Sequence, residues 1–223
     1  MKLAAIVPLN SRSQAKTRLA GVLDAAGRAN LSRWLAWRVI SALHQAEIAH
    51  IGVVSPDDDI LRWAWQSGVQ PVRQIGSGLN DALELGRQWA LRRHAEALLV
   101  VLGDLPLLTH DDILAMVGNM VGYGESTDDK PTMPSVTMAS DRAGKGTNML
   151  LLHPPTAISF AFGEESLVQH SALARAAGIE PRIAGLPGTA FDVDTPDDLR
   201  ELLERGLWRP SATYPHPRAG EAS

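Results

Sequence analysis

The chain has 223 residues, of which 45% are hydrophobic and 21% charged, a composition typical of globular proteins and not of disordered ones. Its 21 Lys and Arg against 25 Asp and Glu give a formal net charge of −4, which excludes a chain-wide basic surface for nucleic acid. Cysteine is absent, so any metal ion must be held by oxygen or imidazole. The first apolar run ends at Pro8, too short for a membrane span, and we expect a cytoplasmic protein with no membrane partner.

Short apolar runs alternate with longer helical patterns over the first half of the chain. Strands are predicted at 3–9, 50–55, 69–73 and 97–103, and helices at 30–46, from 57 onward, at 79–93 and at 109–120. The run at 97–103 is the most apolar, and we expect it to be the central strand, buried on both faces. This alternation predicts βαβ units in a mostly parallel sheet.

The pattern changes after residue 121. A polar loop is predicted at 122–135, a late hairpin from 132–138 and 148–153, helices at 165–178 and 196–205, and strand-like segments at 182–184 and 190–193. We therefore expect one α/β domain over residues 1–207, in which helices flank a mostly parallel central sheet with a late hairpin insertion. Residues 208–223 form a Pro-rich tail that we expect to be loosely ordered.

Three aspartates are the strongest candidates for chemistry. Asp104 directly follows the predicted central strand, at the sheet edge where open α/β proteins bind ligands. Asp192 and Asp194 are two residues apart, so both point to one face if this stretch is extended. Converging carboxylates, without cysteine or paired histidines, predict a hard cation such as Mg²⁺ shared with substrate phosphates. The alternatives are a turn role for Asp104 and a helix-cap role for Asp194.

Cations and glycine-rich turns form the second group of candidates. Lys16 and Arg18 follow the first strand on a loop suited to polyphosphate, although such a pair can also be a solvated helix start. Neither a Walker A loop nor a G-x-G-x-x-G fingerprint precedes them, which disfavours a classical NAD enzyme. Gly-rich turns near 76–80, 141–148 and 162–166 could bind anions through backbone N–H groups. The 7 histidines show no ligand spacing, and we assign none a role.

In their order, these motifs resemble those of the CofC/FbiD family, the guanylyltransferases of deazaflavin coenzyme F-420 biosynthesis and relatives of the MobA-like nucleotidyltransferases. The matching segments are A-K-T-R-L, G-L-N-D-A-L, V-L-G-D-L-P-L-L, D-R-A-G-K-G-T-N, F-G-E-E-S and D-V-D-T-P. They extend from the first strand to about residue 204. One position departs from the family pattern, because Asn10 stands where the family commonly has the lysine of V-P-x-K.

The resemblance implies a single Rossmann-like nucleotidyltransferase domain that joins GMP from GTP to the phosphate of a three-carbon acid and releases pyrophosphate. Phosphoenolpyruvate is the first choice of acid, and 3-phospho-D-glycerate and 2-phospho-L-lactate remain open. Mg²⁺ is the implied cofactor. The implied site residues are Asp104, Asp192 and Asp194 for the metal, Lys16 and Arg18 with Asp104 for catalysis, Gly78, Leu79 and Asn80 for the nucleotide, and Thr147, Gly163 and Ser166 for the acid.

Other partners and functions stay open at this point. They include a homodimer and an association with the downstream enzyme that accepts the activated acid. Competing functions are another MobA-like nucleotidyltransferase acting on molybdopterin or a sugar phosphate, a metal-dependent glycosyltransferase, and a non-catalytic nucleotide sensor. Arg142 and Lys145 are candidates to attract the acid, or are solvated loop cations.

Overall fold

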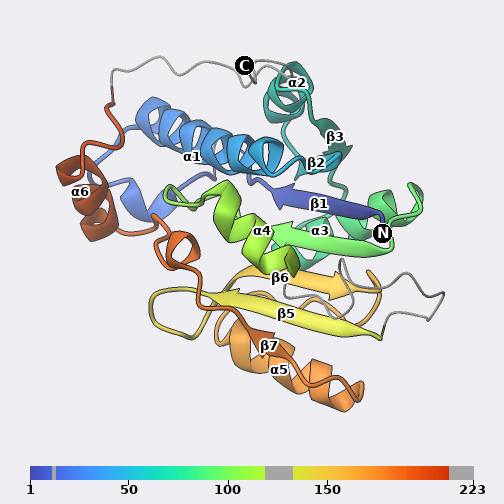
Figure 1. Ribbon diagram of the computed structural model, residues 1–223. Helices are drawn as coiled ribbons and strands as arrows, with labels where there is room; N and C mark the ends of the chain where they lie inside the picture. The colour runs from blue at the N-terminus through green and yellow to red at the C-terminus, as the bar shows by residue number, and fades with distance from the viewer. Residues whose placement is uncertain (12–13, 119–132, 211–223) are drawn as a thin grey trace.

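The computed structural model describes residues 1–11, 14–118 and 133–210, which form a seven-stranded sheet with flanking helices (Figure 1). The strands are β1 Leu3–Pro8, β2 His50–Ser55, β3 Gln70–Arg73, β4 Ala97–Val101, β5 Ser135–Ser140, β6 Thr147–His153 and β7 Arg182–Ile183. The helices are α1 Ala25–Gln45, α2 Asp58–Gln66, α3 Leu79–Leu91, α4 His110–Gly118, α5 Ser166–Ala176 and α6 Pro196–Glu204, with 3₁₀-helices η1 Thr17–Leu19 and η2 Pro187–Thr189.

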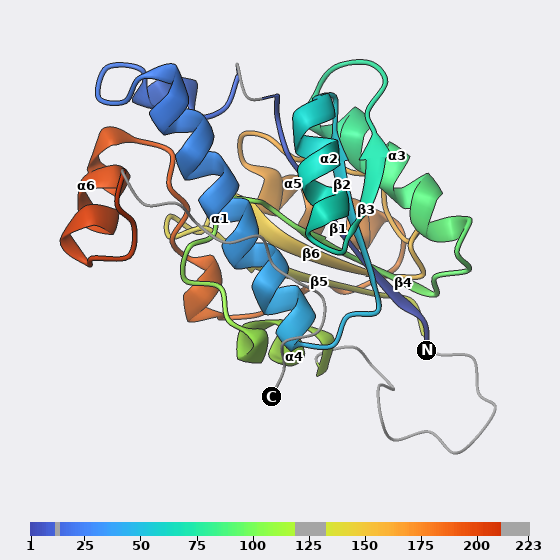
Figure 2. The same cartoon turned by 90° about the horizontal axis from the view of Figure 1, so that it is seen from above.

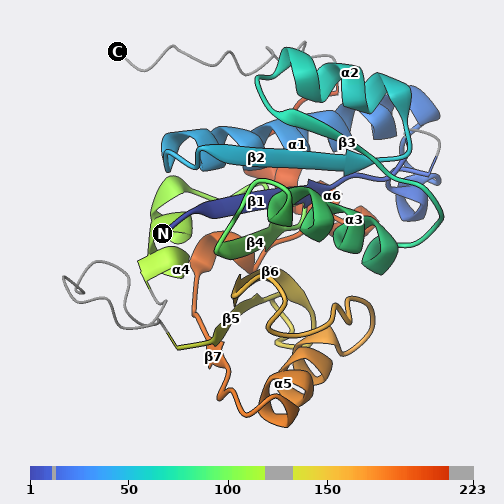
Figure 3. The same cartoon turned by 90° about the vertical axis from the view of Figure 1, so that its right-hand side faces the viewer.

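The sheet has the order β3-β2-β1-β4-β6-β5-β7, which can be followed from top to bottom in Figure 3. β1 pairs in parallel with β2 and β4, and β2 with β3, as the alternation of strands and helices predicts. β6 runs antiparallel to β4 and to β5, so the predicted late hairpin is confirmed. β4 lies at the centre and all of its residues are buried, which confirms the expectation drawn from its apolar sequence.

Helices cover both faces of the sheet, and Figure 2 shows α1 and α3 on opposite sides of the strands. Alternate residues of β1 divide between the two cores, because Ala5 and Val7 pack with α1, α2 and α4 whereas Ala4 and Ile6 pack with α3 and α5. A third cluster joins α6 to the first half of α1 at one end of the molecule. Trp208, placed by the sequence at the start of the tail, is only 1% exposed and packs in this cluster.

One predicted strand is wrong. Residues 190–193 have no strand pairing and form an irregular segment between η2 and α6. Phe191 and Val193 are nevertheless buried in the third cluster. Their burial produces the alternating apolar pattern of a strand, although the segment does not pair with the sheet. Most of the predicted polar loop at 122–135 lies outside the described residues. None of the helices in the described ranges combines the length and the apolar character needed to span a lipid bilayer.

Candidate active site

Three carboxylates converge at the end of β4 from two segments far apart in the sequence. Asp104 follows β4, whereas Asp192 and Asp194 lie on the irregular segment that precedes α6. The Val193 N–H donates a hydrogen bond to the carbonyl of Asp104, 3.3 Å away, and joins the two segments. One carboxylate oxygen of each aspartate lies within 4.8 Å of the other two. The structure therefore brings together the cluster that the sequence predicts.

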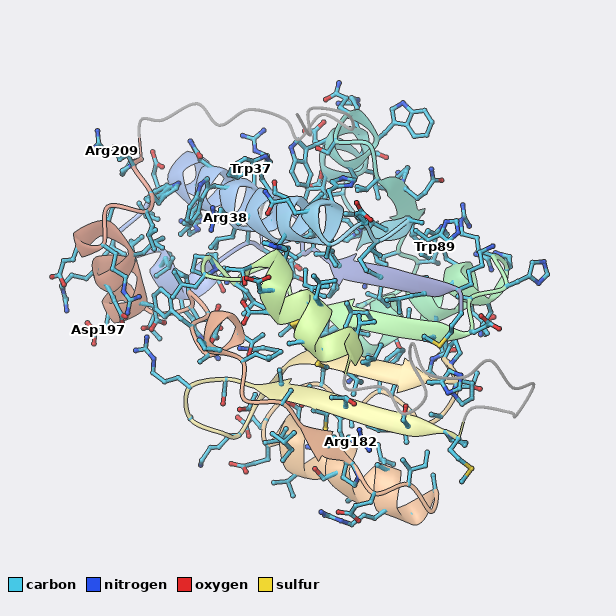
Figure 4. The ribbon with its side chains drawn as sticks, in the orientation of Figure 1. Trp37, Arg38, Trp89, Arg182, Asp197 and Arg209 are labelled. Carbon is cyan, nitrogen blue, oxygen red and sulfur yellow. The ribbon has the colours of Figure 1, made fainter. Side chains whose placement is uncertain are left out.

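The segment that carries Asp104 is fixed from two sides. A Cβ atom on Gly103 would lie 2.4 Å from Cδ2 of the buried Leu9 and 3.5 Å from the carbonyl oxygen of Pro8 at the end of β1, so a larger residue would force the Leu9 side chain to move. Arg38 of α1, labelled in Figure 4, donates its Nε–H to the carbonyl of Pro106 at 3.1 Å. These contacts from β1 and α1 position Asp104 on rigid elements.

Lys16 enters this cluster from the loop after β1. Its Nζ atom lies 2.9 Å from Oδ2 of Asp104 and 2.9 Å from Oδ1 of Asp194. Burial lowers the pKa of Lys16, but the two carboxylates outweigh it and leave this pKa above its usual value. Burial raises the pKa of Asp194, but Lys16 and the more distant Arg18 outweigh it, and the net pKa is lowered. Lys16 is thus a permanent cation at this site.

The negative charge of the carboxylate oxygens that Lys16 does not contact is poorly neutralised by the surrounding residues. Burial, reinforced by Asp104 and Asp194, raises the pKa of Asp192 to about 6. Oδ1 of Asp104 is buried and has no hydrogen-bond partner among the described residues. A buried, unpaired carboxylate oxygen is costly, and a divalent cation with oxygen ligands would compensate it. The donor set of three carboxylates therefore fits Mg²⁺.

A cavity of about 340 Å³ opens beside the cluster, between the loop after β1 and the start of α3. Its walls include most of the residues predicted to contact the nucleotide or the metal, namely Lys16, Arg18, Gly78, Leu79, Asp104 and Asp194. Gly78 precedes α3 with φ of 100°, and as a glycine it provides no side chain to cap the N–H groups of the first turn. Asn10 also lines the cavity, at the position where the resemblance predicts a lysine.

The three residues predicted to bind the acid lie around the start of α5. Thr147 begins β6 and Ser166 begins α5, and Oγ of Ser166 accepts a hydrogen bond from the Thr147 N–H at 2.8 Å. Both residues are 2% exposed. Gly163, on the turn into α5, has φ of 140°, and a Cβ there would meet no atom of the described residues within 4 Å. Open space therefore adjoins the turn where the sequence predicts an anion.

Asn80 differs from the other predicted nucleotide residues because it does not line the cavity. Its Nδ2 donates to the carbonyl of Phe162 at 3.0 Å, and its Oδ1 accepts from the Phe162 N–H at 2.9 Å. The side chain thus joins the start of α3 to the turn that contains Gly163.

Two polar residues at this site were missed by the sequence analysis. The buried Asn148 donates to the carbonyl of Thr189 at 2.9 Å and lies 3.5 Å from Oδ1 of Asp192. The buried ring of His170 lies 3.0 Å from Oγ1 of Thr147. The spacing between Ser166 and His170, which places both on one face of a helix, is the feature that could have indicated a role for this histidine.

Arg142 and Lys145, the candidate cations for attracting the acid, both have carboxylate partners. Arg142 forms two hydrogen bonds with Glu201 of α6, both 3.0 Å, and its guanidinium lies 4.9 Å from the ring centre of Phe191. Lys145 lies 3.1 Å from the carboxylate of Glu165. The turn between β5 and β6 is thereby tied to α6 and to the start of α5.

A family model and curated relatives place the chain in one family, and a solved structure shares its fold. The family model described as "Guanylyl transferase CofC like" matches residues 3–215. The phosphoenolpyruvate guanylyltransferase of Rubrobacter xylanophilus is 40% identical over 206 residues, which cover 92% of this chain and 96% of that protein. The 2-phospho-L-lactate guanylyltransferase of Methanothermobacter thermautotrophicus is 30% identical over 207 residues, covering 92% and 86% respectively. A nucleotidyl transferase structure from the same archaeon shares the fold, with a TM-score of 0.64 at 13% identity over 92% of this chain and 98% of that one.

Proposed function

Because the chain belongs to the CofC family of guanylyl transferases and is thus a nucleotidyltransferase, we propose that it transfers GMP from GTP to a phosphorylated three-carbon acid in deazaflavin coenzyme F-420 biosynthesis. Phosphoenolpyruvate is the first choice of acid, supported by the 40% identical relative of that name. The observation that carries the proposal is that two regions suited to anions are linked through Asn148, whose Nδ2 lies 3.5 Å from Oδ1 of Asp192. One is the cluster of Lys16 and the aspartates beside the cavity, and the other is the pair of buried hydroxyls at the start of α5.

On the nucleotide side, the cavity would hold GTP with its triphosphate toward Lys16 and Arg18. Asp104, Asp192 and Asp194 would hold Mg²⁺. When bound, this ion supplies positive charge against the α-phosphate and the leaving pyrophosphate. The uncapped N–H groups at the start of α3 are further donors for the nucleotide.

On the acid side, the hydroxyls of Thr147 and Ser166 and the start of α5 would donate hydrogen bonds to the acid. A phosphate oxygen of the acid attacks the α-phosphorus of GTP, the bond from this phosphorus to the bridging oxygen breaks, and pyrophosphate leaves. The nucleophile is already an anion, so the step requires no general base. Positioning and charge neutralisation provide the catalysis.

The two sides are joined within the described structure. Asn148 directly follows Thr147, and its Nδ2 lies 3.5 Å from Oδ1 of Asp192. The strand that presents the hydroxyl of Thr147 is therefore connected to the carboxylate cluster. This short connection supports a reaction in which the acid is held beside the nucleotide bound at the aspartates.

The test is to incubate the protein with GTP and Mg²⁺ and with each of the three candidate acids in turn. We expect pyrophosphate release that depends on the acid, and a guanylylated acid identified by mass spectrometry, with phosphoenolpyruvate giving the highest kcat/KM. ATP and CTP in place of GTP are the controls for the base. Absence of turnover with all three acids would contradict the proposal.

A further inference from the structure

His170, to which the proposed reaction gives no role, has both of its ring nitrogens engaged inside the protein. Nε2 accepts a hydrogen bond from the Ala161 N–H at 3.0 Å, and Nδ1 lies 3.0 Å from Oγ1 of Thr147. The residue is 0% exposed. The ring of Phe162 packs edge-on against the imidazole, with 4.8 Å between ring centres. The ring therefore has one fixed orientation between the turn before α5 and the start of β6.

These contacts determine which nitrogen of His170 carries the proton. A backbone N–H can only donate, so Nε2 must be the unprotonated nitrogen that accepts from Ala161. Burial lowers the pKa of His170 to about 4, so the ring is neutral near pH 7 and has a single N–H. That proton is on Nδ1, which donates to Oγ1 of Thr147.

The direction of this hydrogen bond decides what the hydroxyl of Thr147 can do. Since Oγ1 accepts from His170, the hydroxyl proton must point away from the ring, and it has no acceptor among the described residues. Oγ of Ser166 is in the same situation, because it accepts from the Thr147 N–H and its own proton likewise finds no acceptor in the described ranges. Two neighbouring buried hydroxyls are thus left with protons that can be donated to an anion.

We propose that His170 is a positioning residue of the acid site, which fixes the hydroxyl of Thr147 as a hydrogen-bond donor to an anionic oxygen of the phosphorylated acid. The opposite tautomer would reverse the bond, so that Thr147 would donate to the ring and present only lone pairs to the anion. His170 itself does not touch the substrate. The inference rests on the proposed function, which places the acid at Thr147 and Ser166.

Two substitutions separate the contacts of the two nitrogens. His170→Asn places an amide N–H near the position of Nδ1 and retains a donor to Thr147. His170→Gln reaches the position of Nε2, where its amide oxygen accepts from Ala161, and removes the donor to Thr147. We expect His170→Gln to raise the KM for the acid by about tenfold or more with the KM for GTP unchanged, and His170→Asn to change it much less.

A double-substitution comparison tests whether the effect passes through the hydroxyl. Thr147→Val removes the hydroxyl and Thr147→Ser keeps it. In the Thr147→Val background, His170→Gln should add little further change to the KM for the acid, and in the Thr147→Ser background it should have its full effect. Equal effects in both backgrounds, or a parallel rise in the KM for GTP, would assign His170 a purely structural role and overturn the proposal.

The tautomer can be measured in the unsubstituted protein without any turnover. We expect the ¹⁵N spectrum of the His170 imidazole near pH 7 to show the proton on Nδ1 and an unprotonated Nε2. A proton on Nε2 would overturn the proposal, even if the enzyme guanylylates the acid as proposed. Conversely, failure of the unsubstituted protein to use any of the three acids would refute the proposed function and this inference with it, so the two failures are distinguishable.

Discussion

The side-chain amide of Asn80 forms two hydrogen bonds with the backbone of Phe162, one to its carbonyl at 3.0 Å and one from its N–H at 2.9 Å. Asn80 follows Leu79, which lines the cavity, and Phe162 precedes Gly163 on the turn into α5. A single side chain therefore connects the proposed nucleotide side to the proposed acid side.

Asn80→Ala should impair both sides together. It leaves the N–H and the carbonyl of Phe162 unpaired, which we expect to cost about 1–3 kcal/mol of stability and to raise the KM for the acid and for GTP. Gln88→Ala, which removes an exposed hydrogen bond with Glu84 on the same helix, is the matched control. Steady-state kinetics and urea unfolding check both effects, and unchanged KM values would show that the connection is not used.

Asp194→Asn should reduce turnover by at least about 100-fold and leave the fold intact, because the amide keeps the shape but removes the charge that binds a hard cation. Asp197→Asn is the control, since Asp197 is 81% exposed and projects from α6 (Figure 4). Pyrophosphate release and circular dichroism are the measurements. Turnover of Asp194→Asn at the rate of the unsubstituted protein would exclude Asp194 as a metal ligand.

Arg18→Ala should weaken GTP binding by roughly 1.5–3 kcal/mol, the contribution of a hydrogen bond to a charged group. Arg18 borders the cavity, and its side chain is 75% exposed and lies 3.5 Å from the carboxylate of Asp194, beside the proposed position of the triphosphate. Arg62→Ala removes a comparably exposed cation of α2 and should leave the affinity unchanged. Calorimetric titration with GTP decides the matter, and equal affinities for both variants would make Arg18 an ordinary surface cation.

Ser166→Ala should raise the KM for the acid and spare the KM for GTP. It also removes the acceptor of the buried Thr147 N–H, so we expect a stability loss of about 1–3 kcal/mol. Ser171→Ala is the control on the same helix, because the Ser171 hydroxyl only donates to the carbonyl of Leu167, one turn earlier. If the two variants have the same KM for the acid, Ser166 does not bind it.

His170 should make the protein sensitive to mild acid. Its pKa is lowered from 6.5 to about 4 in the folded state, so the unfolded chain binds a proton first as the pH falls. Above about pH 6.5 the titration of His170 does not change the free energy of unfolding. As the pH falls from 6.5 to 4, the titration lowers this free energy by up to about 3 kcal/mol. His170→Asn should remove this part of the pH dependence.

The control for that measurement is His94→Asn, at an exposed position with φ of 55° that asparagine tolerates. Denaturant unfolding at several pH values between 4 and 7.5 gives the comparison. Asp192 titrates in the same range, and because its pKa is raised, its protonation increases the free energy of unfolding as the pH falls. The effect of His170 is therefore obtained as the difference between the unsubstituted protein and His170→Asn. Identical pH profiles would contradict the prediction.

Local pattern was sufficient for the sheet and for the positions of the aspartates. The apolar run that forms β4 had to be a buried central strand, and parallel strands place a residue such as Asp104 at their common carboxyl edge. Local pattern misled at Phe191 and Val193, because burial against α1 and α6 produces the same alternation as a strand. The local pattern did not indicate a role for His170, because its contact with Thr147 forms only when α5 packs beside β6.

Lys16 already has two carboxylate partners before any phosphate group arrives. In the proposed reaction, the contact of this ammonium with a triphosphate would therefore be an exchange of partners, in which the attraction gained is offset by the attraction given up. Such an exchange tempers the affinity for the nucleotide and, by the same amount, for the leaving pyrophosphate. Release of pyrophosphate from the loop after β1 would then be assisted, because Lys16 can pair again with Asp104 and Asp194.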